Sequence, residues 1–205
     1  GHCKSAMVCP FHGWVYNLDG TLRGPARPDT FGDMDRAAFG LKPVEMAIWQ
    51  GFIFLRFLPG PQPAIDELMQ PFEADFAAYR TEELLPADNA GWPATTLPVN
   101  WKSVRDVDNE GYHVAMAHPA LQDLYGRTYR DIVYPGGISH SHGEFGETGG
   151  RLWSVRHYLK LTPRPAWLPP RLRQSWTYYG LFTNTHFAFT PEGDQNYHDI
   201  PLSSR

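Results

Sequence analysis

The sequence of 205 residues has little of what marks several specialised classes of protein. Its two cysteines, Cys3 and Cys9, are too few for a disulfide framework, so a reducing, cytoplasmic location is expected. The longest apolar stretch, residues 48–58, is interrupted by polar residues and is too short to span a bilayer. No signal peptide is recognised, and no membrane association is expected. With a formal net charge of −4 and no basic stripe, the chain is not expected to bind nucleic acid.

What is present describes a packed globular chain. Hydrophobic residues make up 42% of the sequence and charged residues 20%, which argues against disorder. The length is sufficient for one or two domains with a real core. The chain begins at Gly1 without a methionine and ends at Arg205 soon after a strand-like segment. We therefore expect it to be an internal piece of a longer protein.

The densest group of metal-binding side chains lies in Asp106–Pro119, which reads D-V-D-N-E-G-Y-H-V-A-M-A-H-P. This segment holds Glu110, His113 and His118 within nine residues. Two histidines and one carboxylate on one side of an iron ion, with other positions open, form an arrangement that activates O₂. The segment therefore predicts a mononuclear iron site. The alternative is an amphipathic helix whose two histidines are hydrogen-bonded or face solvent.

Helical spacing over residues 101–117 predicts a helix on which Glu110 and His113 share a face. On an unbroken helix, His118 would point away from His113 by roughly 140°. Because Pro119 disfavours helical geometry in the residue before it, we expect the helix to end near His118. The His118 side chain could then turn back toward His113.

A second candidate metal site lies near the start of the chain, at Cys9-Pro10-Phe11-His12. A Cys-x-x-His sequence on a tight loop between two short strands is half of a metal site. One reading is half of a [2Fe–2S] site in which imidazoles replace two thiolates on one iron. A second is a zinc site that adds His2 and Cys3, although neighbouring side chains on a strand point to opposite faces. The third is that Cys9 and His12 bind nothing.

Two segments carry a family resemblance. Residues 9–20, C-P-F-H-G-W-V-Y-N-L-D-G, resemble the second ligand loop of a Rieske domain. Residues 100–121, N-W-K-S-V-R-D-V-D-N-E-G-Y-H-V-A-M-A-H-P-A-L, resemble the iron-site helix of the α (large, catalytic) subunit of Rieske non-haem iron ring-hydroxylating oxygenases. The resemblance implies that Cys9 and His12 are cluster ligands and that His113 and His118 bind the iron.

The resemblance also gives Glu110 the place of a carboxylate that bridges the two metal centres. Asp106 stands where some members of the family have an asparagine near the iron. Helical spacing would return Asp106 to the face of His113 and turn Asp108 away from it. The catalytic residues expected from the resemblance are therefore Glu110 and Asp106.

The chain departs from the complete family pattern in two respects. The upstream Cys-x-His pair is missing, and so is the carboxylate that completes the iron triad, which in the family comes from a later helix. Asp194 and Asp199 could be proposed as substitutes, but the spacing supports neither.

The resemblance implies a [2Fe–2S] Rieske cluster and a mononuclear Fe(II), with electrons that come ultimately from NAD(P)H through a reductase or ferredoxin. The implied reaction uses O₂ to mono- or dihydroxylate, or oxidatively demethylate, a small organic substrate, expected to be aromatic. The implied assembly is a homotrimer, with or without a β subunit, in which electrons cross between neighbouring subunits. Met116, Asn184 and His186 are expected to line the substrate pocket.

The predicted fold class is α+β. Residues 1–60 would be the C-terminal part of an all-β Rieske domain, and residues 64–205 a truncated catalytic domain of helices on an antiparallel sheet, of the helix-grip kind. The expected strands are residues 7–9, 14–17, 44–49, 52–57, 95–99 and 152–161, with a looser one over 178–189. A hairpin turn is expected at Asp19-Gly20, and the strands 44–49 and 52–57 should be joined at Gln50-Gly51. Residues 64–86 should be helical, with Pro71 as a kink or a new start.

Three other interpretations are open. Ser139-His140-Ser141-His142 lies among glycines and is expected to form a solvated loop rather than a metal site. A zinc-stapled binding domain without catalysis is one alternative function, and a Rieske electron carrier is another. About 140 residues follow the Rieske-like part, more than a carrier needs.

Overall fold

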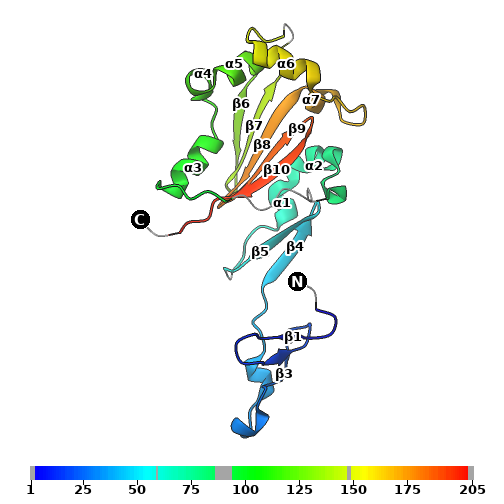
Figure 1. The fold of residues 1–205 in the computed structure, drawn as a ribbon, viewed down its shortest axis with the longest axis vertical. Coiled ribbons are helices and arrows are strands. Elements are labelled where there is room, and N and C mark those ends of the chain that lie inside the picture. The colour runs from blue at the N-terminus through cyan, green and yellow to red at the C-terminus, as the bar shows by residue number, and fades with distance from the viewer. Residues whose placement is uncertain (1–2, 59, 86–93, 147–148, 203–205) are drawn as a thin grey trace. The chain divides into compact units, whose positions relative to one another are not determined.

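The computed structural model describes residues 3–58, 60–85, 94–146 and 149–202, which form two compact units (Figure 1). The first unit contains Gly1–Ala47 and Ile53–Gly60, and the second contains Ile48–Phe52 and Pro61–Arg205. Within the described residues, no helix is both long and apolar enough to cross a membrane.

The first unit is built from short antiparallel strands. Strands β1 (Met7–Val8), β2 (Val15–Tyr16) and β3 (Leu22–Gly24) form one sheet in that order. The Asp19 carboxylate accepts hydrogen bonds from the backbone N–H and the hydroxyl of Thr21, which closes the predicted turn between β2 and β3. The predicted strands at residues 7–9 and 14–17 are confirmed in shorter form. Two 3-10 helices follow, at Pro28–Thr30 and Arg36–Phe39.

Strands β4 (Glu45–Trp49) and β5 (Phe52–Arg56) form a two-stranded sheet, and the predicted hairpin at Gln50 and Gly51 is confirmed. Both turn residues have positive φ, 50° and 85°. A Cβ on Gly51 would also approach the Cα of Glu82 to 2.9 Å, so this turn requires glycine.

The second unit is organised around a five-stranded antiparallel sheet in the order β10-β9-β8-β7-β6 (Figure 1). Its strands are β6 (Arg130–Tyr134), β7 (Ile138–Glu144), β8 (Ser175–Leu181), β9 (Thr185–Thr190) and β10 (Gly193–His198). Because side chains alternate along a strand, Thr177 and Tyr179 of β8 face one side of the sheet, and Tyr178 and Gly180 face the other.

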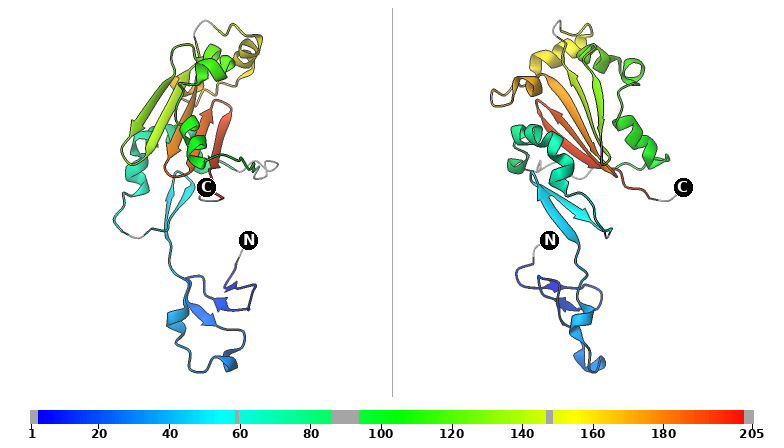
Figure 2. Two further views of the ribbon diagram at one scale, coloured as in Figure 1. Left: turned by 90° about the vertical axis from the view of Figure 1, so that its left-hand side faces the viewer. Right: turned by 180° about the vertical axis from the view of Figure 1, so that it is seen from behind.

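An aromatic core fills the side of the sheet on which Tyr179 lies. Helix α1 (Ile65–Met69), a 3-10 turn (Gln70–Phe72) and α2 (Glu73–Tyr79) cover this side (Figure 2). The interruption occurs at Pro71, as predicted. Phe76 is fully buried, with ring centroids 5.2 Å from Tyr179 and Phe187 and 4.7 Å from Phe189. Burying one such side chain contributes about 1.5–3 kcal/mol.

The side of the sheet on which Tyr178 lies carries α3 (Trp101–Asp108), α4 (Val114–Ala117) and α5 (Pro119–Tyr125) (Figure 2). Tyr125 of α5 is 1% exposed, and its hydroxyl lies 3.2 Å from that of Tyr178. A buried cluster of Leu124, Tyr125, Phe145 and Val155 ties α5 to α6 (Trp153–Leu161). Helix α7 (Pro170–Arg173) leads into β8.

Several expected strands are wrong. Residues 153–161 form helix α6, whose start is stabilised by the Asp123 carboxylate, which accepts hydrogen bonds from the backbone N–H groups of Arg151 and Leu152. These hydrogen bonds hold the two residues before the helix and come from about thirty residues away along the chain, so local alternation could not reveal them. Residues 95–99 form no strand, and residues 178–189 belong to two strands joined by a turn.

The expected solvated loop at residues 139–142 is also wrong, because these residues lie in strand β7. Ser139 and Ser141 are buried, and the His140 ring stacks on Tyr179 with centroids 4.8 Å apart. The Nε2 atom of His140 is buried without a hydrogen-bond partner among the described residues. Burial, and secondly the charge of His142, lowers the pKa of His140 to about 4.

This buried imidazole predicts a pH dependence of stability. Because the folded-state pKa lies near 4 and an unperturbed histidine titrates near 6.5, the unfolded chain binds more protons between these values. Stability should therefore be lost as pH falls from 6.5 to 4, by up to about 3 kcal/mol from this residue. Denaturant unfolding measured across that range should show a weaker pH dependence in His140→Gln than in the wild type. The same change at the exposed His157 should leave the dependence intact, and equal slopes in all three proteins would contradict the assignment.

Candidate metal centre

The site begins where helix α3 ends. The Asn100 side chain caps the start of the helix by accepting a hydrogen bond from the backbone N–H of Lys102. At the other end, the Asn109 side chain donates to the Arg105 carbonyl and accepts from the Ser139 hydroxyl at 2.5 Å. A Cβ on Gly180 would overlap the side chains of Asn109 and Ser139. The absence of a side chain at Gly180 therefore lets the helix end approach the sheet.

The predicted continuous helix over residues 101–117 is wrong in its middle. Residues 109–113 form a turn between α3 and α4, and Gly111 lies so close to the Tyr129 ring that a Cβ there would overlap it. The backbone N–H of Gly111 donates to the Asp131 carboxylate at 2.9 Å. This long-range contact and the absence of a side chain at residue 111 fix the path of the turn.

Glu110 and His113 nevertheless meet as predicted. The Glu110 Oε1 atom lies 2.6 Å from Nδ1 of His113, and its Oε2 atom accepts from the backbone N–H of Tyr112 at 2.6 Å. Burial alone would raise the pKa of the Glu110 carboxyl, but hydrogen bonds from the His113 ring and from the backbone N–H groups of Tyr112 and His113 hold it below its usual value. A carboxylate acceptor places the ring proton on Nδ1, so Nε2 of His113 is free to bind a metal.

His118 turns back toward His113. Helix α4 ends at Ala117, and α5 begins at Pro119, as the proline predicted. The backbone of His118 is non-helical, with φ −128° and ψ 68°, and its ring centroid lies 5.1 Å from that of His113. The imidazoles of His113 and His118 thus lie side by side, and the Glu110 carboxylate is bonded to the Nδ1 atom of His113.

Both histidines line a pocket of about 170 Å³. The pocket collects residues from α3 to α5, the segment before β6, and strands β8 and β10. They are Val107, Asp108, Glu110, His113, Val114, His118, Leu121, Tyr125, Tyr129, Tyr178 and Tyr197. No lysine or arginine is among these lining residues, so the pocket carries two carboxylates, two imidazoles and four phenol rings.

Burial raises the pKa of all four tyrosines of the pocket, so their hydroxyls stay neutral. Burial also raises the pKa of Asp108, although the charge of His186 and a hydrogen bond from Tyr197 act in the opposite direction. These tyrosines were not singled out from the sequence, because Tyr125 on α5, Tyr129 before β6, and Tyr178 and Tyr197 on strands come together only after folding.

The other expected site residues are not among those that line this pocket. Asp106 lies on the exposed side of α3, and Met116 is 89% exposed. Asn184 lies between β8 and β9, and its carbonyl accepts from the backbone N–H of Asp199. His186 is buried on β9, outside the lining of the pocket.

The expectation that Asp108 faces away from His113 is wrong. It assumed one continuous helix, and the break after Asp108 removes that relation. Asp108 instead lines the pocket, and neither Asp194 nor Asp199, the two substitutes considered for the third iron ligand, does so.

In the first unit, Cys9 and His12 lie on the tight loop between β1 and β2. The backbone N–H of Cys9 donates to the Trp14 carbonyl at 2.8 Å, and that of Gly13, with φ of 70°, donates to the Cys9 carbonyl. Backbone N–H groups of His12 and Phe11 point at the Cys9 sulfur and lower the pKa of its thiol. Such a loop favours a thiolate ligand, which fits half of an iron–sulfur site.

The zinc alternative finds no support in the described part of the chain. There, Cys3, Cys9 and His12 do not bring three ligand atoms together, and His2 lies outside the described residues.

Comparison with known proteins gives a consistent picture. Residues 74–205 match the protein family described as "Ring hydroxylating alpha subunit (catalytic domain)". A stretch of 115 residues is 36% identical to the glycine betaine monooxygenase oxygenase subunit of Chromohalobacter salexigens, covering 56% of this chain and 25% of that protein. A stretch of 123 residues is 29% identical to the carnitine monooxygenase oxygenase subunit of Escherichia coli K12, covering 60% of this chain and 32% of that protein.

Among solved structures, the quaternary ammonium Rieske monooxygenase CntA in complex with an inhibitor matches 99% of this chain with a TM-score of 0.71 at 19% identity. Naphthalene 1,2-dioxygenase with bound indole matches 97% with a TM-score of 0.56 at 20% identity. The chain spans about half of each of those solved chains, 51% in both cases. The likeness confirms the predicted fold class.

Proposed function

The chain belongs to the ring-hydroxylating α-subunit family through its catalytic domain, and on this premise we propose that it is part of the terminal oxygenase component of a Rieske-type, O₂-dependent oxygenase. The observation that carries the proposal is the pair of imidazoles of His113 and His118, with the Glu110 carboxylate bonded to Nδ1 of His113. Residues 1–60 would belong to the Rieske domain and residues 64–205 to the catalytic domain.

The donor sets fit the two metal centres that this function requires. Cys9 and His12 would hold the [2Fe–2S] cluster together with a further Cys-x-His pair, and His113 and His118 would hold the mononuclear iron with a further carboxylate. When bound, the iron supplies the activation of O₂, whose oxygen atoms end in a hydroxyl on a substrate carbon and in water, or in two hydroxyls. A reductase or ferredoxin using NAD(P)H would supply the electrons.

The role proposed for Glu110 is to orient His113 and to link the two centres. The structure of CntA was described as giving insights into inter-subunit electron transfer. In this chain, Glu110 Oε1 holds the Nδ1 proton of His113, while its side chain is 40% exposed and open to a further donor. A carboxylate so placed can accept a hydrogen bond from a cluster-bound histidine of a neighbouring subunit, and partners of this kind orient metal ligands.

Replacing the carboxylate by its neutral isostere tests this role. In the full-length enzyme, Glu110→Gln should retain both metals and the oligomer but lose most product formation, because an amide holds the imidazole proton less strongly. Stopped-flow reduction of the cluster should stay fast, while single-turnover product formation slows at least about tenfold. Asp106→Asn, on the exposed side of α3, is the matched control and should turn over normally. Normal turnover in Glu110→Gln combined with loss in Asp106→Asn would transfer the role to Asp106.

The substrate class that we propose is a quaternary ammonium compound, oxidised at an N-methyl carbon. Both curated relatives are named for such substrates, glycine betaine and carnitine, and they do not support the expected aromatic substrate. The pocket beside His113 offers four phenol rings and two carboxylates without a lysine or arginine. Tyrosine faces attract a quaternary ammonium ion through cation–π interactions, each of about 0.5–2 kcal/mol.

An analogue that lacks only the positive charge separates this proposal from simple hydrophobic binding. Glycine betaine should drive product formation and release formaldehyde, whereas 3,3-dimethylbutanoate, which has the same shape but no positive charge, should bind at least about tenfold more weakly. Tyr178→Leu should reduce that discrimination, and Tyr178→Phe should preserve it. Tyr134→Leu removes a tyrosine that packs on Phe72 at 5.4 Å and lies outside the pocket, so it should change nothing. Equal binding of both compounds would contradict the proposed substrate class and leave the oxygenase proposal standing.

A further inference from the structure

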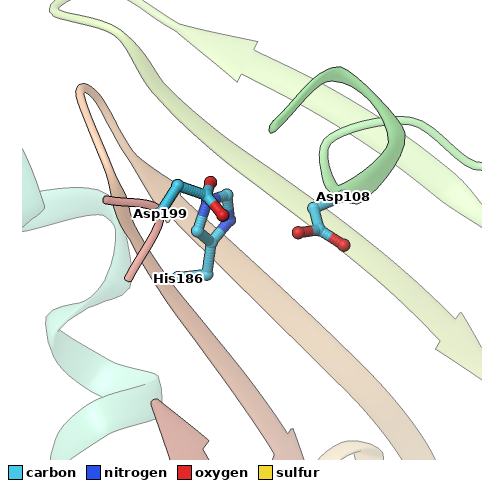
Figure 3. A group of neighbouring side chains, drawn as sticks. All are labelled: Asp108, His186 and Asp199. Atoms are coloured by element: carbon cyan, nitrogen blue, oxygen red, sulfur yellow. The ribbon is translucent and has the colours of Figure 1, made fainter. Parts of the chain in front are cut away.

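Three side chains from distant parts of the chain converge next to the pocket of His113 and His118. Asp108 ends helix α3, His186 lies on strand β9, and Asp199 follows strand β10 (Figure 3). Each offers one ligand atom, and these atoms all lie within 4.8 Å of one another. The Nε2 atom of His186 and an Oδ atom of Asp199 are 2.8 Å apart. In the described part of the chain, no other group of three histidine, cysteine or acidic residues meets this geometry.

The backbone holds all three positions. Asp108 is fixed because Asn109, the next residue, is hydrogen-bonded to Ser139 and lies against Gly180. His186 pairs with Tyr197 across the β9–β10 ladder, and their rings stack with centroids 4.9 Å apart. The backbone N–H of Asp199 donates to the Asn184 carbonyl at 3.1 Å. The convergence therefore follows from sheet register and helix termination rather than from mobile side chains.

His186 is buried in this group, whereas Asp108 and Asp199 are half-buried, and the group holds one more carboxylate than imidazole. His186 is 3% exposed, and the Asp199 side chain is 12% exposed. The only ion pair recorded for either carboxylate within the described residues is that between Asp199 and His186. Arg105 of α3 interacts with both carboxylates at longer range, but its guanidinium donates to the carbonyls of Leu181 and Gly137. Two half-buried carboxylates held this close together repel each other, and a cation bound between them would remove that cost.

We propose that Asp108, His186 and Asp199 bind a divalent first-row transition-metal ion such as Zn²⁺, at a site separate from the iron at His113 and His118. One imidazole and two carboxylates suit such ions, with metal–ligand distances of about 2.0–2.2 Å. Two ligand atoms at right angles would then lie about 3 Å apart, close to the distance between His186 and Asp199. The ion replaces their hydrogen bond, and water completes its coordination.

The residues around the proposed site indicate how an ion could enter it and what a bound ion would do to the pocket. Asp199 also lines a neighbouring cavity of about 530 Å³, which offers a route for the ion. Asp108 lines the pocket of His113. An ion at the cluster would tie the end of α3 to the β9–β10 hairpin and so fix one wall of the pocket. The competing explanation is that His186 and Asp199 keep their hydrogen bond and no ion binds.

The test uses the full-length protein with its [2Fe–2S] cluster. The iron site is removed first, so that the outcome does not depend on oxygenase activity. The His113→Ala/His118→Ala protein is first stripped with a chelator and checked for an intact [2Fe–2S] cluster by visible absorbance. When Zn²⁺ is then added in competition with a chromophoric chelator, the protein should bind one equivalent. Adding His186→Gln or Asp199→Asn should weaken that binding about 100-fold or more, because even indirect partners of metal ligands are worth 10–100-fold.

Two further variants complete the design. Asp108→Asn replaces one carboxylate oxygen of the proposed Zn²⁺ site by an amide nitrogen. This variant should bind Zn²⁺ more weakly and keep its fold, as judged by circular dichroism. Asp194→Asn, a half-buried carboxylate on β10 outside the cluster, is the matched control and should bind Zn²⁺ normally. Absence of the Zn²⁺ equivalent in the His113→Ala/His118→Ala protein, or binding that His186→Gln and Asp108→Asn leave unchanged, would overturn the proposal.

Discussion

The contact between the end of helix α3 and the central sheet is the constraint on which the two proposed metal sites of the second unit depend. The Asn109 side chain bonds to the Arg105 carbonyl and the Ser139 hydroxyl, and Gly180 leaves room for it. Because the helix stops there, Glu110 enters a turn and its carboxylate reaches the His113 ring. The same termination leaves Asp108 beside His186 and Asp199. One local packing event thus positions the acidic residues of two neighbouring sites.

One side of the sheet of the second unit carries the aromatic core, and the other side carries the candidate metal site. On one side, aromatic residues of α2 and strands β8 and β9 form a close-packed core around Phe76. On the other, Tyr178 and Gly180 alternate with those core residues along the same strand and face the turn of Glu110. The rigid core supports the strands, and the strands in turn hold the pocket in place. A change in strand register by one residue would exchange the two roles.

The sequence predicts best what depends on neighbouring residues. The β4–β5 hairpin, the interruption at Pro71 and the turn of the chain at His118 were all predictable from local signals. The sequence-based prediction fails where distant contacts determine the structure. The residues before α6 are held by Asp123, and the break at Gly111 depends on Tyr129 and Asp131. The pairing of Glu110 with His113 survives because a turn also brings residues three apart together. The cluster of Asp108, His186 and Asp199 has no local sequence signal, since its members meet only through the sheet.

The central claim is that His113 and His118 bind an iron ion separate from the cluster of Cys9 and His12. The most direct measurement is the iron content of the full-length protein, with the cluster quantified by its visible absorbance. His113→Ala should lose the mononuclear iron and keep the cluster spectrum, because the two centres use different segments of the chain, whereas His157→Ala should keep both. A His113→Ala protein that retains its full iron content, or that loses iron and cluster together at normal folding yield, would contradict the account.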